Sequence, residues 1–148
     1  MRMRIEIREM TQEDSQDVWV LQKQCFSVPW SLDSIQKMFV TEGYYNLIAK
    51  QGEVLVGYIG MKTVLDEADI TNVAVHPAWR RQEIGKKLLQ GLLERAVQQG
   101  VCQIFLEVRE SNIAARKLYT QAGFKDVDKR KNYYEKPKED AYIMTWKA

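Results

Sequence analysis

The 148-residue chain has few of the residues that build metal clusters and disulfide scaffolds. It holds one histidine, His76, and two cysteines, Cys25 and Cys102, so a Cys/His zinc cluster is excluded and we expect no metal site. The two thiols form no CxxC motif, which favours a reducing compartment, although one disulfide remains open on count alone. We expect both to be buried small apolar groups, with Cys102 on the strand face of Ile104 and Leu106.

Long hydrophobic runs and an excess of charge of one sign are also missing. The longest uncharged apolar run, residues 54–61, is far shorter than the roughly 20 residues of a membrane span, and the first residues lack the apolar stretch of a signal peptide. Lys and Arg number 22 against 20 Asp and Glu, too balanced for binding mainly to phosphates. We therefore expect a cytoplasmic protein with no membrane contact and no direct nucleic-acid binding.

What is present is an ordinary globular composition, with 45% hydrophobic and 28% charged residues. A chain of this length buries roughly 70% of its unfolded surface and needs no metal or disulfide to build a core. Its length is typical of one domain, so we expect residues 1–148 to form a single domain.

Turn signals and hydrophobic periodicity predict an α/β (mixed α+β) protein. The expected strands are residues 3–8, 44–50, 54–65, 70–75, 101–108, 124–134 and 141–146. The expected helices are residues 11–25, 31–40, 84–99 and 112–122. This order predicts helices packed on one sheet, with parallel pieces around the two later helices and a charged loop carrying Pro137 between the last strands.

A basic turn lies where the strand 70–75 gives way to the helix 84–99. Residues 79–87 carry four bases and one acid. The first amides of a helix have no partner within it and lie at its positive end, so with Arg80, Arg81 and Lys86 they would suit a pyrophosphate. A solvated basic turn is the alternative, and charge alone does not decide. The turn matches neither a Walker loop nor GxGxxG.

An acid and a phenol are placed to share one cleft. Glu107 interrupts an apolar strand near its carboxyl end, where open sheets with parallel strands bind ligands. Asn112 and Tyr119 are seven residues apart and would share a helical face. The alternatives are a surface carboxylate paired with Arg109 and a half-buried core tyrosine.

The central turn resembles a known family motif. Residues 72–77, followed by Arg80, Glu83 and Gly85, are similar to the central motif of the GCN5-related N-acetyltransferases (GNAT). The resemblance implies that fold, a single mixed sheet of six to seven strands with about four helices. It also implies acetyl-coenzyme A as cosubstrate. Glu83 stands where the family usually has its first glycine, so its carboxylate would repel a pyrophosphate unless it faces solvent or pairs with Arg80 or Lys87.

The resemblance assigns the cofactor-binding residues. The pantetheine arm would pair with the backbone of the strand, and the pyrophosphate would lie on the amides of the turn. The residues concerned are Val73, Ala74, Val75, Arg80, Arg81, Gln82, Glu83, Ile84, Gly85, Lys86 and Asn112.

Other stretches resemble one branch of the family, the bacterial ribosomal-protein-alanine N-acetyltransferases (RimI type). They are residues 106–109 with 111–112, 26–30, 66–68 and 131–134 with 139–141. The similarity runs from about residue 3 to 146 and implies direct transfer of acetyl, in a ternary complex, to the N-terminal alanine of a small-subunit ribosomal protein. Other protein N-termini, lysines or small amines remain alternative acceptors, and a non-catalytic coenzyme A-binding regulatory module is a third reading.

The implied reaction gives Glu107 and Tyr119 catalytic roles. An α-ammonium has a pKa of roughly 7.7–8.0, against about 10.4 for lysine, so Glu107 would suffice as the base, directly or through a water. A backbone N–H of residues 73–75 would hold the oxyanion. Tyr119 would protonate the leaving thiolate or at least donate a hydrogen bond to it, and we expect a nearby Lys or Arg to lower its pKa.

Three aromatic residues are candidates for acceptor binding. Trp30 follows Pro29 at a helix entry, and Tyr133 and Tyr134 lie in the strand 124–134. Anchoring of the helix and cross-strand packing are equally good explanations of these side chains. His76 is expected to be a turn residue and is not assigned as a base.

Overall fold

The computed structural model describes residues 4–80 and 83–148, so the expected cofactor contacts Arg81 and Gln82 lie outside it. The described residues form one seven-stranded sheet with strand order β1-β2-β3-β4-β5-β7-β6. The strands are β1 Glu6–Glu9, β2 Tyr44–Gln51, β3 Val54–Val64, β4 Glu67–Val75, β5 Gln103–Arg109, β6 Lys125–Glu135 and β7 Lys138–Lys147. The helices are α1 Ser15–Cys25, α2 Leu32–Lys37, α3 Ile84–Gln98 and α4 Ile113–Gln121, with short 3-10 turns η1 Gln12–Asp14, η2 Met38–Val40 and η3 Pro77–Trp79.

The sheet is mixed, as predicted. β4 and β5 pair in parallel, and every other neighbouring pair is antiparallel. The parallel arrangement expected around α3 is therefore confirmed. Around α4 the expectation was only partly right, because β7 lies between β5 and β6.

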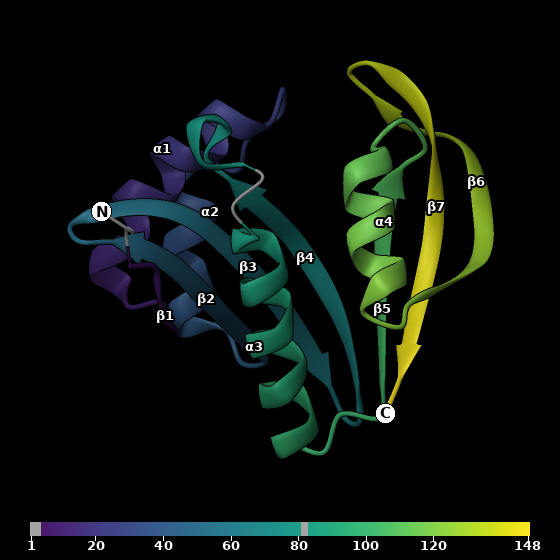
Figure 1. Cartoon of the computed structure of the whole chain (residues 1–148), viewed down its shortest axis with the longest axis horizontal. Helices are drawn as coiled ribbons and strands as arrows, with labels where there is room; N and C mark the ends of the chain where they lie inside the picture. Colours follow the sequence, from purple (N-terminus) through teal and green to yellow (C-terminus); the bar gives the residue numbers. More distant parts are fainter. Residues whose placement is uncertain (1–3, 81–82) are drawn as a thin grey trace.

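Helices cover both faces of the sheet (Figure 1). α3 and α4 pack on one face over the larger apolar core, and α1 and α2 pack on the other over a smaller one. α3 lies very close to β3, since a Cβ on Gly57 would come within 2.9 Å of Leu88 Cδ1 and 3.0 Å of Ile84 Cγ2. The absence of a side chain at Gly57 thus sets the depth at which α3 docks.

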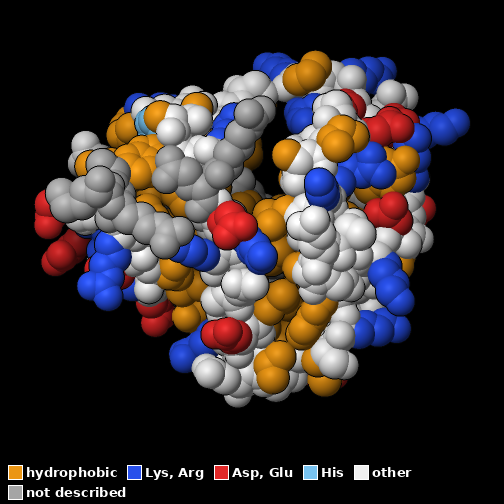
Figure 2. Space-filling model, viewed as in Figure 1, with side chains coloured by type: hydrophobic (Ala, Val, Ile, Leu, Met, Phe, Trp, Pro, Cys, Tyr) orange, Lys and Arg blue, Asp and Glu red, His pale blue; other side chains and the backbone are white. Residues whose placement is uncertain are grey.

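The parallel strands β4 and β5 stay together only at their beginnings. Their pairing is limited to three rungs, from Glu67–Gln103 to Asp69–Phe105. Beyond these rungs β4 continues along β3 and β5 continues along β7, so the two strands diverge (Figure 1). The surface is hollowed between the half of the molecule that contains β4 and the half that contains β5 (Figure 2). The fold therefore opens at the carboxyl ends of its two parallel strands.

The closing hairpin differs from its expectation. β6 ends at Glu135 and β7 begins at Lys138, so the expected charged loop around Pro137 is a tight turn. The prediction of a loop was wrong because β6 is an edge strand whose residues are nearly all exposed. An exposed strand tolerates charged side chains on both faces.

The N-terminal helix also begins later than predicted. Residues 12–14 form the 3-10 turn η1, and α1 starts at Ser15. The buried Asp14 carboxylate accepts hydrogen bonds from Thr11 N at 2.8 Å and from both terminal nitrogens of Arg8 at 2.9 Å. These bonds tie the turn to β1, so tertiary contacts override the simple helical pattern.

The two cysteines are free thiols, Cys25 half-buried and Cys102 exposed. The prediction of a buried Cys102 was wrong, because Cys102 precedes the first residue of β5 while Ile104 and Leu106 lie buried within that strand. Across the described residues, no helix has the length and apolarity needed to cross a membrane.

Candidate active site

In the described part of the chain, the carboxyl-terminal half of β4 has a strand partner on one edge only. Val73, Ala74 and Val75 pair with β3, whereas pairing with β5 stops at Asp69. Main-chain groups on such an edge are available to an extended ligand that adds as a further strand. The three residues expected to hold the pantetheine arm therefore lie at the opening.

β4 contains a bulge next to this edge, close to residues of α1. The register with β3 shifts so that Thr71 has no opposite residue, and bulges of this kind re-aim neighbouring groups at functional sites. Next to it, Gln22 Nε2 donates to Asn72 Oδ1 at 3.3 Å, and Asn72 Nδ2 donates to Gln22 Oε1 at 3.4 Å.

The same amide pair fixes Trp30. Gln22 Oε1 also accepts from the backbone N–H of Trp30 at 3.4 Å, and the Trp30 ring lies edge-on to Tyr58 at 6.2 Å. The Trp30 segment is thus tied to α1 and β4 beside the opening, which is consistent with anchoring and with acceptor binding alike.

The start of α3 explains why the family favours glycine at position 83. Glu83 is the N-cap of α3 and has left-handed backbone angles, φ 60° and ψ 18°, with no capping hydrogen bond from its side chain. Glycine adopts this conformation without penalty, whereas an L-residue pays roughly 1–2 kcal/mol. The Glu83 side chain is exposed, and it forms no ion pair with Arg80 or Lys87 among the described residues.

The other described residues of the basic turn divide between backbone and side-chain roles. Ile84 is buried in the core, so only its amide can face a ligand, and Lys86 is exposed. Gly85 allows α3 and α4 to approach, since a Cβ there would lie 3.3 Å from Leu118 Cδ2. Arg80 Nε donates to the carbonyl of Val75 at 3.2 Å, which places this guanidinium at the end of the open strand.

Glu107 reaches the opening from β5. The alternation along β5 buries Leu106 and Val108 in the α3 and α4 core, so the Glu107 side chain faces the α1 side of the sheet, where it is partly accessible to solvent. Partial burial and the nearby carboxylate of Asp69 raise the pKa of Glu107, and Arg130 acts in the opposite direction. A raised pKa makes Glu107 a stronger base than an ordinary surface carboxylate.

Tyr119 lies on the other side of the sheet. It is buried among apolar residues and packs against Phe124, with ring centroids 5.8 Å apart. Burial, and then the neighbouring Tyr134, raise its pKa well above the usual range. The expected lowering by a Lys or Arg was wrong, because this side chain lies in an apolar core and no cation among the described residues offsets its desolvation.

Asn112 serves α4 directly. It is the N-cap of that helix, and its Oδ1 accepts from Ala115 N at 3.1 Å. The capping bond uses the side-chain oxygen and leaves the amide nitrogen for a ligand. Its expected partner on the same face, Tyr119, is buried, whereas Asn112 itself is exposed.

The two tyrosines of β6 lie beside Glu107. The Tyr133 ring is 45% exposed and meets Tyr134 edge-on at 5.1 Å. Burial and the Glu107 charge raise the pKa of both, that of Tyr134 to about 12. The hairpin therefore brings two phenols within the electrostatic influence of Glu107.

Sequence reasoning missed Asp69, because the predicted strand began only at residue 70. Since β4 in fact begins at Glu67, Asp69 lies on the last rung shared with β5, opposite Phe105 and two residues short of Glu107. The alternation of Ala68, Asp69 and Ile70 as apolar, acidic and apolar was the sequence signal that could have revealed it, and the structure buries the two apolar residues and exposes Asp69. His76 is a turn residue, as predicted, and its Nδ1 accepts from Ala78 N at 3.1 Å.

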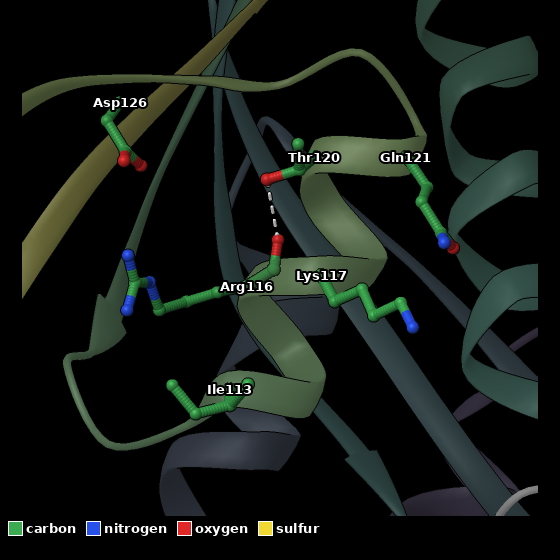
Figure 3. A pocket seen from close by; sticks show the side chains of 6 residues that line it. All are labelled: Ile113, Arg116, Lys117, Thr120, Gln121 and Asp126. Carbon is green, nitrogen blue, oxygen red and sulfur yellow. Dashed lines mark hydrogen bonds between the residues drawn. The ribbon is translucent and has the colours of Figure 1, made fainter.

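Two surface hollows lie away from these residues. One, of about 400 Å³, lies along α4 and the start of β6, lined by Ile113, Arg116, Lys117, Thr120, Gln121 and Asp126 (Figure 3). The other, of about 500 Å³, lies between β1, β2 and α3. Neither contains Glu107 or Tyr119.

Comparisons with known proteins identify the family of this chain. A model of the acetyltransferase (GNAT) family matches residues 15–124. The ribosomal protein bS18-alanine N-acetyltransferase of Haemophilus influenzae is 40% identical over 134 residues, 88% of this chain and 90% of the relative. Its counterpart in Haemophilus ducreyi is 34% identical over 141 residues, 93% and 97% of the two chains.

A solved structure shows the same fold. The crystal structure of the ribosomal-protein-S18-alanine N-acetyltransferase from Escherichia coli has a TM-score of 0.90 to this chain at 32% identity, covering 97% of this chain and 94% of the other. The predicted fold class and the family resemblance are confirmed. The chain belongs to the acetyltransferase (GNAT) family.

Proposed function

We propose that this protein transfers the acetyl group of acetyl-coenzyme A to the N-terminal alanine of ribosomal protein bS18. The relatives that share 34–40% of its residues over nearly the whole chain bear that activity in their names. The observation in the structure that supports the proposal best is the open edge of β4 with Glu107 beside it. A ribosomal protein as acceptor also favours the cytoplasm as the place of action.

The chain offers acetyl-coenzyme A a fitting surface. The main chain of residues 73–75 would bind the extended pantetheine arm, and the amides at the start of α3 would bind the pyrophosphate. Exposed Lys86 would add positive charge there. Arg81 and Gln82 remain proposed contacts on the strength of the sequence motif alone.

Glu107 acts as the base. The α-ammonium of a peptide has a pKa of roughly 7.7–8.0 and must lose a proton before its nitrogen attacks the thioester carbonyl. The raised pKa of Glu107 reduces the pKa difference between this carboxyl and the α-ammonium. A lysine side chain, at about 10.4, leaves a much larger gap, which favours an N-terminal acceptor.

Tyr119 serves the leaving sulfur from the other side of the sheet. Because burial raises its pKa, the phenol stays protonated throughout the working pH range. It can therefore donate a hydrogen bond to the thiolate as the carbon–sulfur bond breaks, whereas the raised pKa makes transfer of its proton to the sulfur less favourable. A backbone N–H of residues 73–75 would stabilise the oxyanion of the reacting carbonyl.

The deciding experiment compares acceptors. Purified protein is incubated with acetyl-coenzyme A and a peptide copying the bS18 N-terminus, and the product is located by tandem mass spectrometry. We expect acetyl on the α-nitrogen of alanine and none on lysine side chains. Matched controls are the same peptide with its N-terminus blocked and the Glu107→Gln variant, expected to lose at least about 100-fold in kcat/KM.

Two results would contradict the proposal. Acetylation of lysine in the blocked peptide would show that the acceptor is a lysine side chain and not a protein N-terminus. Calorimetric binding of coenzyme A without transfer to any peptide would favour the regulatory module over an enzyme.

A further inference from the structure

The turn of the β6–β7 hairpin is held by one side chain from β5. Arg109 Nη1 donates to the carbonyl of Pro137 at 2.9 Å and to Glu139 Oε1 at 3.2 Å, while Nη2 donates to the carbonyl of Lys136 at 3.3 Å. Its guanidinium carbon also lies 4.2 Å from the centroid of the Tyr134 ring. A single guanidinium thus contacts both strands of the hairpin and the turn between them.

Two further contacts extend this arrangement. The second oxygen of Glu139 accepts from Ser111 N, at the start of the α4 segment. Ser27 Oγ, in the segment between α1 and α2, donates to the same Lys136 carbonyl at 2.6 Å. The hairpin turn is therefore held by contacts from two places, from β5 and from the segment between α1 and α2 that carries Trp30.

The hairpin needs such an anchor because its own pairing is irregular. The register between β6 and β7 breaks between Arg130 and Tyr134, and Asn132 has a left-handed φ of 55°. Tyr133 therefore emerges from a stretch that regular strand pairing does not fix. Tyr134 begins the regular rungs again, opposite Glu139, which is itself bound by Arg109.

We propose that Arg109 is a positioning residue, which holds the hairpin turn and Tyr134 in place beside Glu107 so that the acceptor N-terminus is correctly bound. The ion pair with Arg109 that was the alternative explanation of Glu107 does not form among the described residues, since Arg109 pairs with Glu139. The effect on the acceptor rests on the proposed function, whereas the anchoring itself does not.

The residue type is part of the inference. A guanidinium is planar, carries five N–H donors in a fixed fork and stacks on aromatic faces. A lysine keeps the charge but cannot reach three acceptors in one plane while covering a ring. Arg109→Lys therefore separates geometry from charge, and Arg109→Gln removes both.

The first readout is hydrogen exchange of the free protein, which needs no acceptor. We expect Arg109→Lys and Arg109→Gln to speed exchange of the amides in residues 131–139 by about tenfold or more, with exchange elsewhere unchanged. Ser27→Ala should act in the same direction with a smaller effect. Lys138→Gln is the matched control, because it removes an exposed cation next to the turn.

The second readout is steady-state kinetics with the alanine peptide. Both Arg109 variants should raise the acceptor KM by about tenfold, while kcat at saturation and the KM for acetyl-coenzyme A stay within about threefold. Wild-type exchange and KM in Arg109→Lys would overturn the proposal in favour of charge alone. Faster exchange with an unchanged acceptor KM, or faster exchange throughout the protein, would overturn it as well.

Failure of the proposed function is recognised separately. If the wild-type protein does not acetylate the alanine peptide, the acceptor assignment falls. The exchange pattern then decides the anchoring: faster exchange confined to residues 131–139 supports it, and any other pattern overturns it.

Discussion

The chemistry of the site depends on how its surroundings set the proton affinity of single residues. Glu107 faces Asp69 from β4 and Arg130, Tyr133 and Tyr134 from β6. Partial burial and Asp69 outweigh a backbone hydrogen bond and Arg130, so the pKa of this carboxyl is raised. A base must be deprotonated to work, and activity should therefore be lost on acidification at a higher pH than an isolated glutamate would give.

Replacing Asp69 with Asn tests this account. The substitution removes a negative charge that disfavours ionisation of Glu107, so the pKa of Glu107 falls and the acidic limb of the kcat/KM profile moves to lower pH. Asp66→Asn, on the neighbouring turn, is the control. An acidic limb that stays in place or moves to higher pH in the Asp69 variant would show that Glu107 is not the titrating base.

Tyr119→Phe tests the proposed role of the phenol. Loss of the phenolic O–H should lower kcat by about 100-fold and leave the KM for acetyl-coenzyme A within about threefold, since the ring still fills the core. Tyr45→Phe, on β2, removes a hydroxyl away from the opening and should change neither constant. Equal kcat in Tyr119→Phe and the wild type would remove this phenol from the mechanism.

Single residues also show where sequence reasoning ends. That Glu107 lies near a strand end and Tyr119 on a helix was predictable from the local pattern, because both are local features. The pKa of Tyr119 did not follow, because it depends on packing against Phe124 and on Tyr134, contacts made only in the folded chain.

At the scale of elements, helix α3 carries a built-in strain at its first turn. Glu83 holds a left-handed conformation that glycine adopts freely, and the side chain contributes no cap. We expect Glu83→Gly to stabilise the protein by about 1 kcal/mol in urea unfolding, and Glu83→Ala to give no such gain because it keeps the strained backbone. Both variants lack the carboxylate, so both should leave or lower the KM for acetyl-coenzyme A.

The contrast between the two variants is decisive. A stability gain shared equally by Gly and Ala would assign the effect to the charge. A large rise in the KM for acetyl-coenzyme A in both would give the Glu83 carboxylate a positive role in binding.

The junction of β1 and η1 depends on a paired carboxylate. Burial opposes ionisation of Asp14, but hydrogen bonds from Arg8 and Thr11 outweigh it, so its folded pKa is lowered. The resulting stability is complete above the unfolded pKa of about 3.9 and is lost as the pH falls through the folded pKa. Asp14→Asn should therefore cost about 2 kcal/mol near neutral pH and much less in strong acid.

Urea unfolding at neutral and acid pH measures this difference. Asp33→Asn is the control, because its pair with Lys37 is exposed on both sides and should contribute less than about 0.5 kcal/mol. An Asp14 variant that loses the same stability at both pH values would contradict the assignment to the charged form.

At the scale of the whole molecule, function follows from a sheet that is closed at one end and open at the other. The order of strands and helices was predictable, since each segment carries its own periodicity and turn residues. The point where β4 and β5 separate was not, because it depends on β7 pairing with β5 and on β3 retaining β4. The hydrophobic pattern alone does not predict which neighbouring strand a buried strand pairs with.

The central claim is that this opening holds the thioester between a carboxylate and a phenol from opposite faces of the sheet. A crystal structure of the protein with coenzyme A and an alanine peptide tests it most directly. The account predicts the pantetheine arm along residues 73–75, the pyrophosphate at the start of α3, and the sulfur within reach of Tyr119, with Glu107 contacting the peptide nitrogen directly or through one water. Coenzyme A bound elsewhere, or Glu107 beyond the reach of a bridging water, would contradict it.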